Sequence, residues 1–162
     1  MENNVKTLGI HLKVADFDKS KEFYDSLGLE PVFAYGPEEY LKSLPEGLAT
    51  APEKYRGIEY KAGNADIEIS EDHVGIAKKE TFQEEIKSAK VSAMINVDTL
   101  TPLFSNPLVD IKFPVRHYYW NTIEVAFRDP DGFVLVFIAP YSEEEFKKVS
   151  ELADIEVVNP GE

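Results

Sequence analysis

The segment of residues 127–138 constrains the fold of this chain more than any other. It joins the end of one apolar strand to the start of another through the turn Asp129-Pro130-Asp131-Gly132. Proline fixes φ at the second turn position, and the Asp-Gly pair tolerates the unusual backbone conformation that follows. The segment therefore predicts a β-hairpin in which residues 120–128 pair with residues 133–138.

The elements expected before this hairpin follow a recognisable order. Residues 8–14 alternate apolar and polar side chains, which is typical of a half-buried strand. A helix capped by Asp16 or Asp18 is expected to run to about Ser26, and Gly28 supplies the left-handed stop. One helical stretch and three further strands follow, at 38–43 and at 31–35, 58–61 and 65–70. The first half of the chain thus reads βαβββ.

The same order then begins again. Thr81-Phe82-Gln83-Glu84 is a capping-box pattern that predicts the start of a short helix in the connection. The later elements are a strand at 91–97, a short helix or turn at 98–104, a weak strand at 110–114, the hairpin, and a helix over 142–153. We therefore expect an α+β protein with two βαβββ modules, an internal repeat, and a C-terminal helix.

The length of the chain, 162 residues, fits a single domain over 1–162. Its parts are a first module at 8–71, a linker at 72–90, a second module at 91–139 and the helix at 142–153.

Composition limits the compartment and the partners. A net charge of −13 repels phosphate backbones and anionic membranes, so we expect no nucleic-acid or membrane partner. No apolar run approaches the roughly 18 residues of a membrane span, and the first residues lack the pattern of a signal peptide. The absence of cysteine fits a reducing compartment and excludes thiolate chemistry. We expect a cytoplasmic protein.

Two segments carry a resemblance to a known family. Residues 11–24 read H-L-K-V-A-D-F-D-K-S-K-E-F-Y and are followed by Leu27-Gly28-Leu29, and the turn at 129–132 lies near the other end. In this order and at this separation they resemble the first strand, first helix and last hairpin of the vicinal oxygen chelate superfamily. That superfamily includes glyoxalases, bleomycin-resistance proteins and extradiol dioxygenases. The resemblance covers about residues 8–139, with insertions around 36–57 and 72–90.

The resemblance implies that the two modules form a curved mixed sheet whose concave face is a ligand groove. Many relatives hold a divalent metal there, and their four ligand positions fall on Gly9, Glu68, Ser92 and Val136 of this chain. Only the glutamate among these is a useful ligand, whereas a divalent ion needs three or four converging donors. We therefore expect no metal and no other cofactor. The chain looks closer to the bleomycin-resistance branch, which binds a ligand without converting it, and no catalytic residue is assigned.

Strand alternation predicts which side chains face the groove. We expect the ligand, a small polar or aromatic organic molecule, to contact His11, Lys13, Glu68, Met94, Asn96, Arg116, Tyr118, Trp120 and Glu124. The segment 116–120 is the richest, because its guanidinium and rings could pair a carboxylate and stack an aromatic group. Dimer contact or core packing is an equal alternative for that segment.

Other functions stay open. His11, Glu68 and Glu124 could form a displaced metal site, which would make the chain a metal-dependent lyase, isomerase or dioxygenase. His11 and Glu68 could also form an acid/base pair for proton transfer. A groove that has become a surface for a protein partner is a third hypothesis. Since related proteins often form homodimers, we expect a homodimer here as well.

Overall fold

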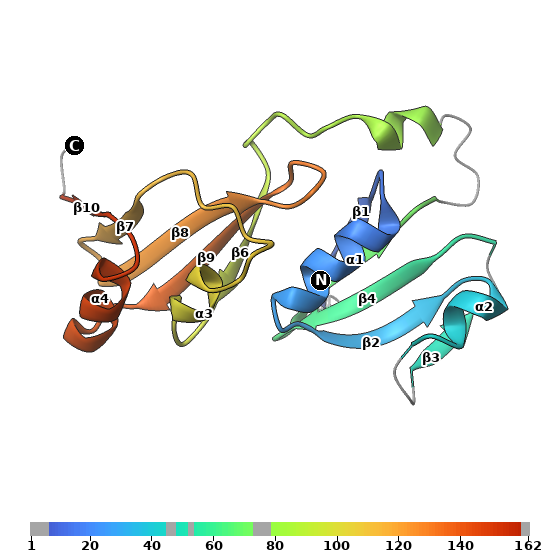
Figure 1. The fold of residues 1–162 in the computed structure, drawn as a ribbon, viewed down its shortest axis with the longest axis horizontal. Coiled ribbons are helices and arrows are strands. Elements are labelled where there is room, and N and C mark those ends of the chain that lie inside the picture. Colours follow the sequence, from blue (N-terminus) through green and yellow to red (C-terminus); the bar gives the residue numbers. More distant parts are fainter. Residues whose placement is uncertain (1–6, 45–47, 52–53, 73–78, 160–162) are drawn as a thin grey trace, which may run out of the picture. The chain divides into compact units, whose positions relative to one another are not determined.

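The computed structural model describes residues 7–44, 48–51, 54–72 and 79–159 of the chain (Figure 1). The chain divides into two compact units, unit 1 over residues 1–85 and unit 2 over residues 86–162. The boundary between them falls within the segment 72–90 that the sequence predicts as a linker. Each unit contains its own five-stranded sheet, so each is described by itself.

Unit 1 is an α+β module with one mixed sheet. Its elements are β1 (Leu8–Lys13), α1 (Phe17–Ser26), β2 (Glu30–Tyr35), α2 (Glu38–Leu41), β3 (Ala49–Ala51), β4 (Gly57–Ala62), β5 (Ala65–Ser70) and a short 3-10 helix, η1 (Lys79–Gln83). The strand order is β1-β5-β4-β2-β3. β1 is parallel to β5 and β3 is parallel to β2, whereas β4 is antiparallel to both of its neighbours.

Helix α1 begins and ends where the sequence predicts. The side chain of Asp16 accepts a hydrogen bond from the backbone N–H of Lys19 and so caps the helix. Gly28 follows the helix with φ of +75°, a conformation that glycine adopts without steric cost. On the inner side of the helix, the buried ring of Tyr24 stacks on Tyr60 of β4, with 6.0 Å between ring centroids. The helix therefore covers one face of the sheet.

Unit 2 repeats this arrangement. Its elements are β6 (Ser92–Asn96), α3 (Thr101–Phe104), β7 (Val115–Tyr118), β8 (Thr122–Arg128), β9 (Val134–Pro140), α4 (Glu143–Ser150) and β10 (Ile155–Val158). The strand order is β10-β7-β8-β9-β6, with β6 parallel to β9 and β10 parallel to β7. Order and direction match those of unit 1 strand by strand. The predicted α+β fold with two βαβββ modules is confirmed.

The predicted hairpin is also present, with β8 antiparallel to β9. The carboxylate of Asp129 closes its turn by accepting hydrogen bonds from the backbone N–H groups of Asp131, at 3.0 Å, and Phe133, at 2.8 Å. Gly132 has φ of +90°, and a Cβ at this position would lie 2.3 Å from the carbonyl oxygen of Ile86. The turn therefore requires glycine both for its backbone conformation and for the close approach of the segment before β6.

Helix α4 lies within the range 142–153 that the sequence predicts. Ser142 caps it by accepting a hydrogen bond from the backbone N–H of Glu145 at 3.1 Å. The buried carboxylate of Glu145 in turn accepts hydrogen bonds from the backbone N–H of Leu100, at 2.7 Å, and from the hydroxyl of Thr99. This contact ties α4 to the start of α3. In the part of the chain that the structure describes, no helix is long and apolar enough to cross a membrane.

Alternation along the strands separates a packed face from an open face. On β8 and β9 the packed face consists of the buried side chains of Ile123, Val125, Phe127, Leu135, Phe137 and Ala139, and Ile138 is buried on the other face. The rings of Phe127 and Phe137 stack at 5.3 Å within this layer. The intervening side chains, such as Glu124 and Ala126, are more exposed. The more exposed face is where the sequence places the ligand-contacting residues of the second module.

Three local expectations differ from the structure. Residues 110–114 form no strand, and β7 begins only at Val115, since Pro114 has no N–H for a strand ladder. Thr81 does not start a helix, because it lies inside η1, which ends at Gln83. The two edge strands β3 and β10 were not expected, and they extend the sheets by pairing with β2 and β7.

Replacing Gly132 by alanine is expected to destabilise the protein more than replacing Gly63. Both glycines have positive φ, +90° and +63°, but nothing lies within 4 Å of the position of a Cβ on Gly63. We expect the free energy of unfolding to fall by about 1 kcal/mol for Gly63→Ala and by roughly 2–4 kcal/mol for Gly132→Ala, measured by urea denaturation. Equal losses would contradict the close packing of Ile86 on the turn.

Candidate functional site

Five polar side chains of unit 1 meet on one face of its sheet, and we call them the unit-1 cluster. They are His11, Lys13, Tyr35, Glu68 and Ser70. The parallel pairing of β1 with β5 places His11 opposite Glu68 and Lys13 opposite Ser70. Residues two apart in a strand share a face, so all four side chains emerge on the same side of the sheet.

Short contacts join the members of the unit-1 cluster. Nε2 of His11 is 3.3 Å from Oε1 of Glu68 and 3.1 Å from the hydroxyl of Ser70. Nζ of Lys13 donates to the hydroxyl of Ser70 at 2.8 Å and to the ring of His11. The phenol of Tyr35 donates to Oε1 of Glu68 at 2.6 Å. The structure thus brings together His11, Lys13 and Glu68, which the sequence predicts as contact residues.

Tyr35 is the member that sequence reasoning missed. It lies on β2, and its ring crosses β4 at Gly57, its partner in the strand register. A Cβ on Gly57 would lie 2.2 Å from Cζ of the tyrosine, so only glycine leaves room for the crossing. Burial and the hydrogen bond to Glu68 raise the pKa of Tyr35 well above its usual value. The phenol therefore stays neutral and donates to Glu68.

The charges of the unit-1 cluster partly balance one another. Burial lowers the pKa of Lys13 below its usual value, while the carboxylates of Glu68 and Asp72 act in the opposite direction. On the neighbouring strand, burial and the carboxylates of Asp66 and Glu68 raise the pKa of Glu59. Ammonium, imidazole, carboxylate and phenol are therefore available within one small area. Such a set can donate to, and accept from, the polar groups of an organic molecule.

The unit-1 cluster does not fit a divalent metal ion. His11 and Glu68 are its two side chains of metal-ligating type, and the ammonium of Lys13 donates a hydrogen bond to the same ring nitrogen of His11 that faces Glu68. An ammonium in contact with a ligand nitrogen repels a metal cation. Two side-chain ligands are also too few for a stable metal site. Over the described ranges of the chain, no group of three or more His, Cys, Asp or Glu side chains could hold a metal ion.

Unit 2 presents a second group of predicted residues, which we call the unit-2 cluster. It consists of Arg116, Tyr118, Trp120, Thr122 and Glu124, around the β7–β8 connection. The rings of Tyr118 and Trp120 stack at 4.3 Å and are nearly parallel. Oε1 of Glu124 accepts hydrogen bonds from the indole of Trp120 at 3.2 Å and from the hydroxyl of Thr122 at 2.6 Å. Because Trp120 remains 50% exposed, the stack can receive a further flat group.

Alternation divides the segment 116–120 between two roles. Arg116 and Tyr118 point to the same side, and Nη1 of Arg116 lies 3.5 Å from the tyrosine hydroxyl. His117, between them, stacks instead on Tyr141 at 4.2 Å and contacts Phe146 of α4. His117 thus serves core packing, which was the alternative interpretation of this segment, whereas Arg116 and Tyr118 belong to the unit-2 cluster.

Met94 and Asn96 lie on β6, at the opposite edge of the sheet from β10. Register places Asn96 beside Ile138, Ile138 beside Glu124, and Glu124 beside Arg116. These four residues form a row across four neighbouring strands, which spans about 14 Å at the usual strand spacing. Met94 is 68% exposed. Both β6 residues therefore share the face of the unit-2 cluster but do not contact it.

Glu124 was also the third member of the displaced metal site considered from the sequence. It belongs to unit 2, where its carboxylate already accepts two hydrogen bonds, whereas His11 and Glu68 belong to unit 1.

Comparison with known proteins identifies the family. The sequence model of the Glyoxalase/Bleomycin resistance protein/Dioxygenase superfamily matches residues 8–137. The chain belongs to this superfamily, as the resemblance of its motifs predicted. No curated protein matches the chain.

Solved structures share the fold at low sequence identity. SMU.1112c is 18% identical with a TM-score of 0.55, and the match covers 85% of this chain and 99% of that one. A glyoxalase/bleomycin resistance protein/dioxygenase from Nocardioides is 15% identical with a TM-score of 0.53, covering 84% and 83%. The fosfomycin resistance protein FosX from Listeria monocytogenes, in complex with Mn(II) and sulfate, is 13% identical with a TM-score of 0.51, covering 91% and 99%.

The crossing of Tyr35 over Gly57 can be tested with a matched pair of glycines. Gly57→Ala is expected to lower the free energy of unfolding by about 1–3 kcal/mol, because the new methyl group overlaps the tyrosine ring. Gly9→Ala is the control, since the nearest atom to its Cβ would be the backbone oxygen of Asp66 at 3.7 Å. That variant should change stability by less than about 0.5 kcal/mol in urea denaturation. Equal effects would contradict the crossing.

The protonation of Lys13 is a second test. Its pKa is expected below that of the exposed Lys148, whose pKa is raised by Glu144. Because the charge of Glu68 counteracts the effect of burial, Glu68→Gln should lower the pKa of Lys13 further and leave that of Lys148 unchanged. NMR titration of the lysine side-chain resonances measures both values. A rise in the pKa of Lys13 upon this substitution would disprove the arrangement.

Proposed function

We propose that this chain is a metal-free member of its superfamily, similar to bleomycin-resistance proteins, that binds a small polar or aromatic organic ligand. The observation that carries the proposal is the contact of Lys13 with the ring of His11 beside Glu68. A cation of the protein thus lies next to the two side chains that would otherwise be the best metal ligands of unit 1. The remaining hydrogen-bonding capacity of the cluster suits an organic molecule.

The two clusters indicate the chemistry of the ligand. The unit-1 cluster offers Lys13 as a donor, Glu68 as an acceptor and the ring of His11 as either, depending on its tautomer, which suits a molecule with several polar substituents. The unit-2 cluster offers the half-exposed Trp120 for stacking, and Arg116, which is paired with Glu156 at 3.5 Å, for an anionic group that displaces this exposed partner. Met94 and Asn96 extend this face. Each cluster by itself thus suits a small organic molecule, a polar one in unit 1 and a planar one with an anionic group in unit 2.

The second candidate is an enzyme of lyase, isomerase or dioxygenase type with a displaced site at His11, Glu68 and Glu124. The distance of 3.3 Å between Nε2 of His11 and Oε1 of Glu68 favours it, because this pair could also transfer a proton. The ammonium of Lys13 at the same nitrogen argues against a metal-dependent version. We therefore rank ligand binding without conversion first.

We also propose that the protein is a cytoplasmic homodimer without nucleic-acid or membrane partners. The support is the frequent dimerisation of related proteins, the acidic net charge of −13 and the absence of cysteine.

Fluorescence of Trp120, the single tryptophan of the chain, tests ligand binding. In a screen of aromatic antibiotics and metabolites with EDTA present, we expect at least one compound to change the emission in a saturable way. Glu124→Gln should weaken binding at the unit-2 cluster, and Lys13→Met binding at the unit-1 cluster, by about five- to tenfold, as expected for the loss of one charged hydrogen bond. Lys148→Met, on the exposed side of α4, is the control and should leave the affinity unchanged.

Two results would overturn the proposal. One is a ligand whose effect on the emission appears only after a divalent metal is added. The other is an affinity that stays the same in both the Glu124→Gln and the Lys13→Met variant.

A further inference from the structure

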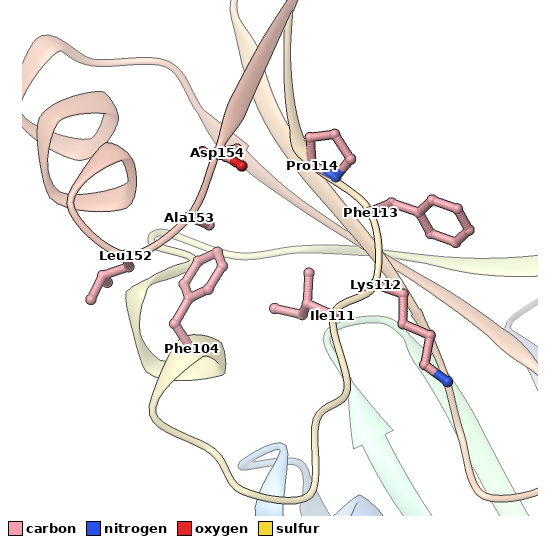
Figure 2. Close-up of a pocket in the computed structure, with 8 residues that line it drawn as sticks. All are labelled: Phe104, Ile111, Lys112, Phe113, Pro114, Leu152, Ala153 and Asp154. Atoms are coloured by element: carbon pink, nitrogen blue, oxygen red, sulfur yellow. The ribbon is translucent and has the colours of Figure 1, made fainter.

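Unit 2 contains a pocket that includes none of the predicted ligand-contacting residues. It has a volume of about 300 Å³ and is lined by Phe104, Ile111, Lys112, Phe113, Pro114, Leu152, Ala153 and Asp154. These residues come from three separate segments: helix α3, the chain before β7, and the chain between α4 and β10 (Figure 2). The backbone hydrogen bond from Val115 to the carbonyl of Asp154, at 2.9 Å, holds the second and third segments together.

Six of the eight residues that line this pocket are apolar, although polar and apolar atoms contribute similar shares of its accessible surface. In Figure 2 the ring of Phe104 lies among Ile111, Leu152 and Ala153, with the side chain of Ile111 extending toward it. Leu152, at the mouth, is 52% exposed. When an apolar ligand covers apolar side chains that are exposed to water, the buried surface lowers the free energy of the complex. A volume of this size is at the lower end of the range for small-molecule sites and suits a single ring or a short alkyl chain.

The charges around the pocket favour a cation. Lys112 extends away from Phe104 in Figure 2 and pairs with Asp110 at 2.9 Å, so its charge is partly neutralised. Asp154 lies at the edge of the pocket, and within the described part of the chain no basic side chain forms an ion pair with it. The ring of Phe104 also attracts a cation over its face. The net charge of −13 raises the local concentration of cations around the whole protein.

We propose that this pocket is a second binding site, for a small organic ammonium ion with an aromatic ring or a short alkyl chain. The apolar part of the ligand packs against Phe104, Ile111 and Ala153, and its ammonium group pairs with the carboxylate of Asp154. The site is independent of the function proposed above, because neither the unit-1 cluster nor the unit-2 cluster contributes to it.

The test compares three probes of similar size and different charge: 2-phenylethylamine, 2-phenylethanol and phenylacetate. Binding to the full chain is followed by the backbone amide resonances of Ile111, Ala153 and Asp154. We expect saturable shifts with the amine, binding of the alcohol that is about fivefold weaker, and weaker binding still of the carboxylate.

Two variants separate charge from shape. Asp154→Asn keeps the backbone and should reduce the affinity for the amine to that for the alcohol, without changing the latter. Ala153→Phe fills the interior and should abolish binding of both probes, and preserved thermal unfolding would show that the variant is folded. Val91→Ala, at an exposed apolar residue just before β6, is the control and should bind as the unchanged chain does.

Three outcomes would overturn the proposal. They are no saturable shift at these amides with any probe, equal affinity for all three probes, and shifts at the same amides that depend on protein concentration without a probe. The last result would mean that a second copy of the chain covers the pocket.

Discussion

In each unit the first strand lies parallel to the last strand of the same βαβββ module, and the register of this pair determines which side chains can meet. In unit 1 the backbone N–H of Val14 donates to the carbonyl of Ser70, and in unit 2 Val97 donates to Ile138 in the same way. A shift of one residue would turn every side chain of β1 to the opposite face and bury charged groups against α1. Burial of the apolar face of each sheet therefore determines which side chains lie on the more exposed face.

The matching registers also show how the two units have diverged. His11 opposite Glu68 in unit 1 corresponds to Met94 opposite Val136 in unit 2. The same place in the fold thus carries an ionisable pair in one unit and an apolar pair in the other. Unit 2 has its polar groups elsewhere, around the stacked rings of Tyr118 and Trp120. The two open faces thus offer different chemistry on the same scaffold, polar and ionisable groups in unit 1 and stacked rings in unit 2.

Much of the fold could be predicted because its signals are local. Asp16 and Gly28 mark the ends of α1, and the turn at 129–132 joins β8 to β9. The strand β10 has no such signal: its four residues become a strand by pairing with β7. Strand alternation likewise placed His11 and Glu68 on one face. Strand alternation could not predict that Tyr35 contacts Glu68, because the tyrosine ring reaches it by crossing Gly57, a residue on a different strand.

The pocket around Phe104 was missed for the same reason, since three segments far apart in the sequence line it. Spacing within one segment carries no information about such a site. The resemblance of motifs, in contrast, predicted the family correctly, because the first strand, the first helix and the last hairpin follow one another in the family's order along the chain.

The central claim is that Lys13, His11 and Glu68 form a hydrogen-bonded cluster of the protein itself in place of a metal site. Metal titration of chelator-treated protein tests this most directly, with calorimetry and elemental analysis for Mn²⁺, Fe²⁺, Ni²⁺ and Zn²⁺. We predict no stoichiometric binding in the micromolar range, with the Glu68→Gln variant behaving as the unchanged chain does. Stoichiometric micromolar binding that is lost in Glu68→Gln would contradict the account.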